Sequence, residues 1–171
     1  MKSEDKYSKI IAAGLLIVLI GIVVYYYLPD LLILPNLSTA GFVRMNIEVD
    51  ARNDDGVVIM TGNCYQVVAS VEKDQAISML DGMNKVVGIR PNVHDLFRDT
   101  LNALDAKILM IKITDVKEDV YISKMLIRKG NTLLNLDARP SDAMAVALRM
   151  DYTVPVYMNE TLLAKQGTKI C

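Results

Sequence analysis

The spacing of hydrophobic and polar positions changes several times along the chain, and each change predicts an element. Near the N-terminus, the run "IIAAGLLIVLIGIVVYYYL", residues 10–28, carries no charged side chain. A helix of this length covers the ~30 Å hydrocarbon core of a bilayer. Residues 10–28 are therefore predicted to form a transmembrane helix, which ends where Pro29 and Asp30 follow.

The basic residues around this run predict its orientation. Three lysines lie in residues 1–9, whereas Arg44 is the only basic residue among residues 29–51. The positive-inside rule then makes residues 1–9 a cytoplasmic tail and places the remainder of the chain outside the cytoplasm. A cleaved signal peptide is the competing interpretation, but the small residues at 38–40 lie far beyond the apolar core, so a retained anchor is favoured. Residues 29–41 are predicted to be a juxtamembrane linker.

The rest of the chain, residues 42–171, has the pattern of one compact domain. Groups of strands alternate with groups of helices, which predicts an α+β fold with helices packed on a mostly antiparallel or mixed sheet. Two of the helices are expected to bury an apolar face. The face of the first contains Ile77, Leu80 and Met83, and that of the second contains Val93, Leu96, Phe97, Leu101 and Leu104. The predicted strands are 42–51, 56–60, 64–71, 107–116, 120–128, 132–136 and 153–157, and the predicted helices are 73–84, 93–105, one beginning near 140, and 160–165.

Charge and composition limit the possible chemistry. The chain has 19 basic and 20 acidic side chains and a net charge of −1, which is unlike the basic surface of nonspecific nucleic-acid-binding proteins. With a single histidine, any metal site has to consist mainly of carboxylates. Cys64 and Cys171 lack the spacing of zinc or thioredoxin motifs. They would pair in an oxidising exterior and stay reduced inside the cell, and the sequence leaves both states open.

The stretch "RPNVHDLF", residues 90–97, is the first candidate for chemistry. Asn92 is a good helix N-cap, and Asp95 three residues later completes a capping box, so helix initiation alone explains both. His94 falls at the border of the apolar face of the predicted helix. Both a structural and a catalytic role for His94 stay open.

The second candidate is "DARPSDAMAVALR", residues 137–149, in which charges crowd at the start of an otherwise apolar helix. Pro140 suits a first helical turn, and Asp142 lies near the positive end of the helix dipole. Asp137 and Arg139 can form an ion pair. However, an arginine beside the backbone N–H groups of a helix start is also how proteins hold phosphate. Stabilisation of the helix start and phosphate binding would thus each be sufficient to explain these charges.

Taken together, "RP..HDL", "V.I.D......Y" and "LDARPSDAMAVALR" resemble the bifunctional nuclease domain family in order and spacing over nearly all of residues 42–163. The resemblance implies an α+β domain that forms homo-oligomers and cleaves DNA and RNA. Val93 stands where the family pattern has threonine, and Ile122 stands where it often has a small residue. The predicted transmembrane segment is a larger departure, because it moves an intracellular type of domain onto a membrane.

If the chain is a nuclease, the matching residues take three roles, provided that the starts of the two helices meet. The catalytic residues are expected to be His94, Asp95 and Asp142, with His94 as general base or acid. Phosphate is expected to bind Arg90, Arg139 and Ser141, and Mg²⁺ or Mn²⁺ to bind Asp95, Asp137 and Asp142. The alternative is a non-enzymatic, membrane-anchored interaction or assembly module in which both motifs are structural.

Overall fold

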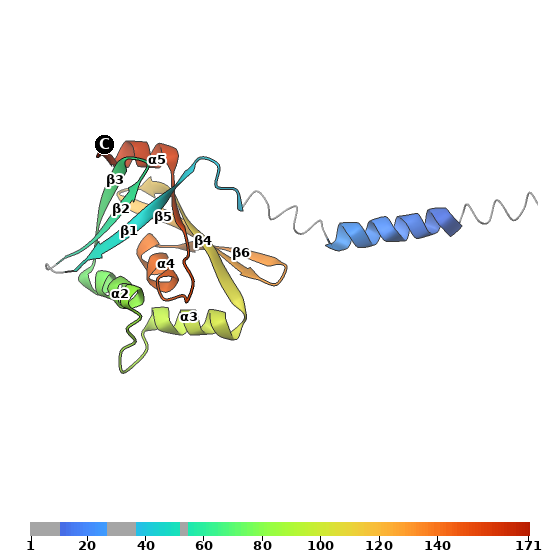
Figure 1. Ribbon diagram of the computed structural model, residues 1–171, viewed down its shortest axis with the longest axis horizontal. Helices are drawn as coiled ribbons and strands as arrows, with labels where there is room; N and C mark the ends of the chain where they lie inside the picture. Colours follow the sequence, from blue (N-terminus) through green and yellow to red (C-terminus); the bar gives the residue numbers. More distant parts are fainter. Residues whose placement is uncertain (1–10, 27–36, 52–54) are drawn as a thin grey trace, which may run out of the picture. The chain divides into compact units, whose positions relative to one another are not determined.

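The computed structural model describes residues 11–26, 37–51 and 55–171 (Figure 1). The chain divides into an N-terminal unit, residues 1–38, and a compact unit, Thr39–Cys171, whose start lies close to the predicted domain boundary at Phe42. The predicted tail at residues 1–9 and most of the predicted linker lie outside the described residues.

The N-terminal unit contains a helix over residues 11–26 with exposed apolar side chains. Within the described part of the chain, no helix has both the length and the apolar character that a membrane span requires. The predicted transmembrane helix is thus not borne out, and its outer positions 10, 27 and 28 lie outside the described residues.

The compact unit is built on one eight-stranded mixed sheet in the order β6-β5-β4-β7-β1-β2-β3-β8. Its first half is an antiparallel meander closed by a short edge strand, and its second half is another antiparallel meander. The short β7 lies between them, antiparallel to β1 and parallel to β4. The strands are β1 (Phe42–Asp50), β2 (Gly56–Gly62), β3 (Tyr65–Val71), β4 (Ala106–Lys117), β5 (Val120–Lys129), β6 (Thr132–Ala138), β7 (Val156–Asn159) and β8 (Thr168–Lys169).

Two of the hairpins turn over two residues in the left-handed region. Asn63 and Cys64 have φ of 47° and 63°, and Glu118 and Asp119 have φ of 49° and 64°. Positive φ at both central positions is the geometry whose twist matches that of the flanking strands. These turns therefore fix the register of β2 with β3 and of β4 with β5.

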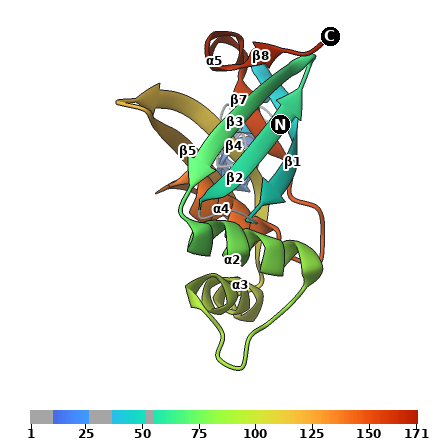
Figure 2. The ribbon, with the colours of Figure 1, turned by 90° about the vertical axis from the view of Figure 1, so that its left-hand side faces the viewer.

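Four helices accompany the sheet: α2 (Lys73–Asn84), α3 (Val93–Ala103), α4 (Pro140–Ala147) and α5 (Glu160–Gln166). The first three gather at one end of the unit, and α5 lies at the opposite end beside the C-terminus (Figures 1 and 2). Every residue of α4 from Ala143 to Ala147 is buried. Its alanines allow close approach to α2, where a Cβ added at Gly82 would lie 3.2 Å from the Ala145 carbonyl oxygen.

The buried faces of α2 and α3 differ from the predicted ones. In α2 the buried residues are Ala76, Ser78, Met79 and Gly82, whereas Ile77 is 41% exposed. Three of these four residues are small, which allows the close approach of α4, and Met79 belongs to the hydrophobic core. In α3, Leu101 is buried as predicted, whereas Val93, Leu96 and the C-cap residue Leu104 are exposed and Asp95 is buried in their place.

Methionine fills much of the core between the sheet and the helices. Its flexible thioether suits irregular gaps of the kind that a mixed sheet and three crossing helices leave. The buried methionines are Met45, Met60, Met79, Met125, Met144, Met150 and Met158, so core packing accounts for most of the ten in the chain.

A disulfide joins Cys64 to Cys171, although the sequence alone left their redox state open. Cys64 lies in the turn between β2 and β3, and the backbone N–H of Ile170 donates to its carbonyl oxygen. The bond ties the last residue of the chain to the first meander and closes a loop with a sequence separation of 107.

Candidate functional site where two helices begin

The starts of α3 and α4 meet, as the predicted site requires. Asn92 caps α3 by accepting hydrogen bonds from the backbone N–H groups of His94 and Asp95, and the Asp95 carboxylate closes the capping box. This local structure directs His94 toward α4, where its Nε2 lies 3.5 Å from Asp142 Oδ1. His94 is 15% exposed and Asp142 34%, so both groups lie at the boundary between core and solvent.

Arg139 completes the polar group at the start of α4. Its Nε and Nη2 donate to the two carboxylate oxygens of Asp142 at 2.7 and 3.2 Å. The hydrogen bonds that Arg139 donates to Asp142, together with the negative charge of that carboxylate, raise the pKa of Arg139 above its ordinary value, so the guanidinium stays charged. The arginine is 64% exposed, and its five N–H donors leave some for a bound anion.

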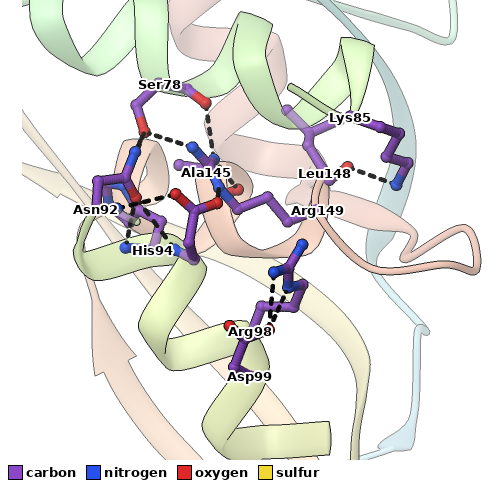
Figure 3. A network of polar contacts seen from close by, with 10 residues as sticks. Ser78, Lys85, Asn92, His94, Arg98, Asp99, Ala145, Leu148 and Arg149 are labelled. Atoms are coloured by element: carbon purple, nitrogen blue, oxygen red, sulfur yellow. Dashed lines mark hydrogen bonds and ion pairs between the residues drawn. The ribbon is translucent and has the colours of Figure 1, made fainter. Parts of the chain in front are cut away.

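His94 is held from its other side by a buried network (Figure 3). Its Nδ1 lies 2.8 Å from Ser78 Oγ of α2. The same hydroxyl receives hydrogen bonds from Arg149 Nη2 at 3.1 Å and from Asn92 Nδ2 at 3.4 Å. Three helices thus fix the position of one imidazole.

Asp95, predicted as a catalytic and metal-binding residue, is instead part of this buried network. It is 1% exposed, and its Oδ1 accepts from Arg149 Nε at 2.6 Å while Oδ2 accepts from the backbone N–H of Asn92. Burial by itself raises the pKa of Asp95, but the Asn92 N–H and the Arg149 guanidinium outweigh burial and hold the pKa below its ordinary value. With both oxygens occupied inside the protein, Asp95 does not face the site.

The other predicted residues lie at different places. Asp137 is exposed and forms an ion pair with Lys124 of β5 at 3.0 Å, although it also contributes to the wall of the cavity described below. Arg90 is exposed in the segment between α2 and α3. Ser141 is buried in the first turn of α4. Neither Arg90 nor Ser141 lines the cavity, so the site brings together His94, Asp142 and Arg139.

The predicted three-carboxylate metal cage does not fit these positions. Asp95 is directed at Arg149 and Asp137 at Lys124, which leaves Asp142 alone beside His94. Across residues 11–26, 37–51 and 55–171, no three histidine, cysteine, aspartate or glutamate side chains are grouped as a metal site requires. Binding of Mg²⁺ or Mn²⁺ stays a prediction for which this chain supplies few ligands of its own.

A cavity of about 370 Å³ opens beside the three polar residues. Its polar lining comes from His94, Arg139, Asp142 and Asp137, and the remainder is apolar. The apolar lining consists of Val93, Phe97, Met125, Leu136, Ala138, Ala143 and Val146 from α3, α4, β5 and β6. An apolar pocket with a few convergent polar groups is the usual form of a ligand site.

Sequence reasoning missed Ser78 and Arg149, which support the site from behind. The buried ion pair of Arg149 could have been predicted, because Arg149 directly follows the apolar run of residues 143–148 and a charge in such a run requires a buried acidic partner. Ser78 carried a weaker signal, since its burial depends on which face of α2 packs inward. That face was predicted wrongly.

Comparison with known proteins identifies the family of the chain. The model of the bifunctional nuclease domain matches residues 57–170, which is about two thirds of the chain. The chain belongs to the bifunctional nuclease domain family. Both candidate motifs, at residues 90–97 and 137–149, lie inside the matched region.

Several relatives share part of this family domain. Uncharacterized protein Rv1829 of Mycobacterium tuberculosis is 36% identical over 81 residues, which cover 47% of this chain and 46% of that protein. Bifunctional nuclease 1 of Oryza sativa subsp. indica is 25% identical over 103 residues, which cover 58% of this chain and 30% of that protein. Bifunctional nuclease 2 of Arabidopsis thaliana is 21% identical over 98 residues, or 56% and 29% of the two chains. The chain thus matches less than half of each relative's length.

Proposed function

We propose that the chain hydrolyses phosphodiester bonds in DNA or RNA at the cavity where α3 and α4 begin. The observation that carries the proposal is the grouping of His94, Asp142 and Arg139 at the edge of that cavity. Family membership supports it, because distant relatives from plants are named bifunctional nucleases.

The cavity has chemical groups suited to a nucleotide. Arg139 would bind a phosphate oxygen through its remaining N–H donors, and the apolar wall, with Phe97, would receive a base or sugar. In hydrolysis a water oxygen bonds to phosphorus, the bond from phosphorus to one sugar oxygen breaks, and a base takes the proton of the water. His94 and Asp142 would share this acid–base work and stabilise the charge that develops on the phosphate.

The metal requirement belongs to the test of this proposal. Mg²⁺ is commonly held by one or two carboxylates together with substrate phosphates, so Asp142 and a bound nucleic acid would supply such a set. The full chain is incubated with single-stranded DNA and with RNA in Mg²⁺, Mn²⁺ or a chelator, and cleavage is measured.

Variants then test the residues. We expect His94→Ala and Asp142→Asn each to lower cleavage by about 10²-fold or more, since each removes an acid–base or charge-stabilising group. Arg98→Ala is the matched control, because Arg98 forms an exposed ion pair with Asp99 on α3 and does not line the cavity. Undiminished cleavage in both site variants would refute the assignment.

A second candidate function, a non-enzymatic interaction or assembly module, is favoured by a different observation. Large apolar side chains are exposed around the α2–α3 connection, and they are Val86, Val87, Ile89, Val93 and Leu96. A surface of this kind marks binding sites for other proteins. Failure of the folded chain to cleave under any metal condition would favour this candidate. The homo-oligomer implied by the family stays a prediction, which light scattering of the purified chain checks.

The disulfide supports placement of the domain outside the cytoplasm. Disulfides persist in oxidising compartments and are rare in reducing ones. We infer that the Cys64–Cys171 bond forms in the cell, and that cysteine-reactive maleimide will label the protein from freshly lysed cells only after reduction. Immediate labelling, or protection of the domain from protease added to intact cells, would contradict this placement.

A further inference from the structure

The hydroxyl group of Ser78 has three neighbours that determine where its hydrogen lies. Arg149 Nη2, Asn92 Nδ2 and His94 Nδ1 are at 3.1, 3.4 and 2.8 Å from Ser78 Oγ. Ser78 is 8% exposed and Arg149 is 2% exposed, so packing fixes both, whereas the exposed Asn92 is held by its capping hydrogen bonds. Neighbouring protein groups therefore determine the hydrogen bonds of this hydroxyl (Figure 3).

Two of the three neighbours donate to the hydroxyl and cannot accept from it. A guanidinium nitrogen of Arg149 is always a donor, as is the amide nitrogen of Asn92. The orientation of that amide is set independently, because Asn92 Oδ1 accepts from the backbone N–H groups of His94 and Asp95. Since the two lone pairs of Ser78 Oγ are occupied in this way, its single hydrogen remains for the third neighbour.

We propose that Ser78 is a positioning residue that holds neutral His94 with its hydrogen on Nε2. Nδ1 accepts the hydrogen of Ser78, so Nε2 carries the ring's own hydrogen and directs it at Asp142, 3.5 Å away. The imidazole thus presents an N–H group, and not a lone pair, at the cavity. The tautomer is determined from α2, which contributes no residue to the cavity wall.

This inference rests on the proposed function and divides the roles within it. His94 Nε2–H donates a hydrogen bond to a phosphate oxygen as negative charge develops there. Without a lone pair at Nε2, His94 does not take the proton of the attacking water, which goes to the Asp142 carboxylate. The orientation of His94 is what makes this division possible.

The contacts from Ser78 through His94 to Asp142 resemble a nucleophilic triad, but the serine lies on the side of His94 away from the cavity. A nucleophilic serine must reach the substrate and give its proton to the histidine as it attacks. Ser78 is buried behind the imidazole and does not line the cavity, whereas Asp142 does. The contact between Ser78 and His94 is thus one of support.

Nuclear magnetic resonance of the imidazole nitrogens tests the tautomer directly. His94 is the single histidine of the chain, so uniform ¹⁵N labelling of the full chain gives one pair of ring signals. In the neutral ring, we expect a protonated Nε2 and an unprotonated Nδ1. A protonated Nδ1 in the wild-type protein would overturn the proposal without the need for any variant.

Variants show whether Ser78 is responsible. Loss of one hydrogen bond in Ser78→Ala is expected to lower the ratio of the Nε2–H to the Nδ1–H tautomer by roughly fivefold. Thr100→Ala is the matched control, since it removes a hydroxyl from the same helix as His94 that bonds only within that helix, to the Leu96 carbonyl oxygen. An unchanged ratio in folded Ser78→Ala refutes the role of Ser78. If that variant does not fold, Ser78→Thr, which keeps a hydroxyl, is compared with the wild type instead, and a shifted ratio there counts against the proposal.

A second measurement separates this inference from the nuclease proposal. Glutamine carries an N–H donor but is not a base, so His94→Gln is expected to cleave about 10-fold faster than His94→Ala. Equal loss in both variants would mean that His94 acts as the base, and would overturn the inference while the nuclease proposal stands. Conversely, a correct tautomer in a chain that cleaves no nucleic acid would refute only the nuclease proposal.

Discussion

Replacement of Arg149 by methionine tests the buried network most severely. Arg149 makes four hydrogen bonds: to Asp95 Oδ1 at 2.6 Å, to the carbonyl oxygens of Ser78 and Ala145 at 2.7 Å each, and to Ser78 Oγ at 3.1 Å. Methionine fills similar space but donates to none of these groups. The Asp95 carboxylate would then be left 1% exposed with only the backbone N–H of Asn92.

Removal of one partner from a buried ion pair typically costs about 3–5 kcal/mol, because the other charge stays buried without compensation. A domain of this size loses roughly 3–4 °C in melting temperature per kcal/mol. We therefore expect Arg149→Met to lower the free energy of unfolding by about 3–5 kcal/mol and the melting temperature by about 9–20 °C. Denaturant unfolding followed by circular dichroism measures the first quantity, and a thermal scan measures the second.

The chain supplies a matched control for this experiment. Arg139 also pairs with an aspartate, Asp142, but it is 64% exposed, and such pairs contribute less than ~1 kcal/mol. Arg139→Met should therefore unfold close to the wild type. The double variant Asp95→Leu with Arg149→Met should recover part of the loss, since it removes both charges. If Arg149→Met destabilises no more than Arg139→Met, the network does not hold the three helices together.

Three further predictions follow from other features. Reduction of the Cys64–Cys171 disulfide should lower the free energy of unfolding by about 2–5 kcal/mol, since the closed loop is long. Denaturant unfolding curves with and without reductant measure this loss, and coincident curves would contradict the prediction. Gly56→Ala should destabilise by about 1–3 kcal/mol, because the added Cβ would lie 2.4 Å from the Ala76 Cβ, whereas Gly88→Ala meets nothing closer than 3.5 Å and serves as the control. The folded-state pKa of Asp95 lies below its ordinary value of 3.8, so the ionised carboxylate stabilises the fold above pH 3.8, and this contribution is lost as the pH falls through the folded-state pKa. The difference in unfolding free energy between wild type and Asp95→Asn should therefore shrink over that acid range, and a constant difference would refute the assignment.

The sequence predicted most elements because local signals and long-range packing agree in them. The α2 bounds, 73–84, match the prediction, and the two tight turns at Asn63–Cys64 and Glu118–Asp119 lie between strands that alternation had already separated. The face of α2 was predicted wrongly and that of α3 only in part correctly, because hydrophobic spacing ranks side chains by polarity alone. In the folded chain, the close approach of α4 selects small residues and a buried ion pair.

The candidate site was predictable in part for a related reason. His94, Asp142 and Arg139 belong to short motifs at helix starts, and these starts do meet. Asp95 directly follows His94, so in a helix their side chains point about 100° apart. The sequence did not reveal that one direction leads to the cavity and the other to buried Arg149. Ser78 lies in an element 16 residues away from His94 and carries no motif of its own.

The position of β7 has a consequence for how the chain is made. Residues 156–159 pair with β1 on one side and β4 on the other, so both of those strands have an open edge until this segment has emerged from the ribosome. Unpaired strand edges invite pairing with other molecules. We therefore expect the nascent protein to depend on protection by chaperones until β7 emerges, and truncations just before residue 156 to aggregate instead of forming a smaller native sheet.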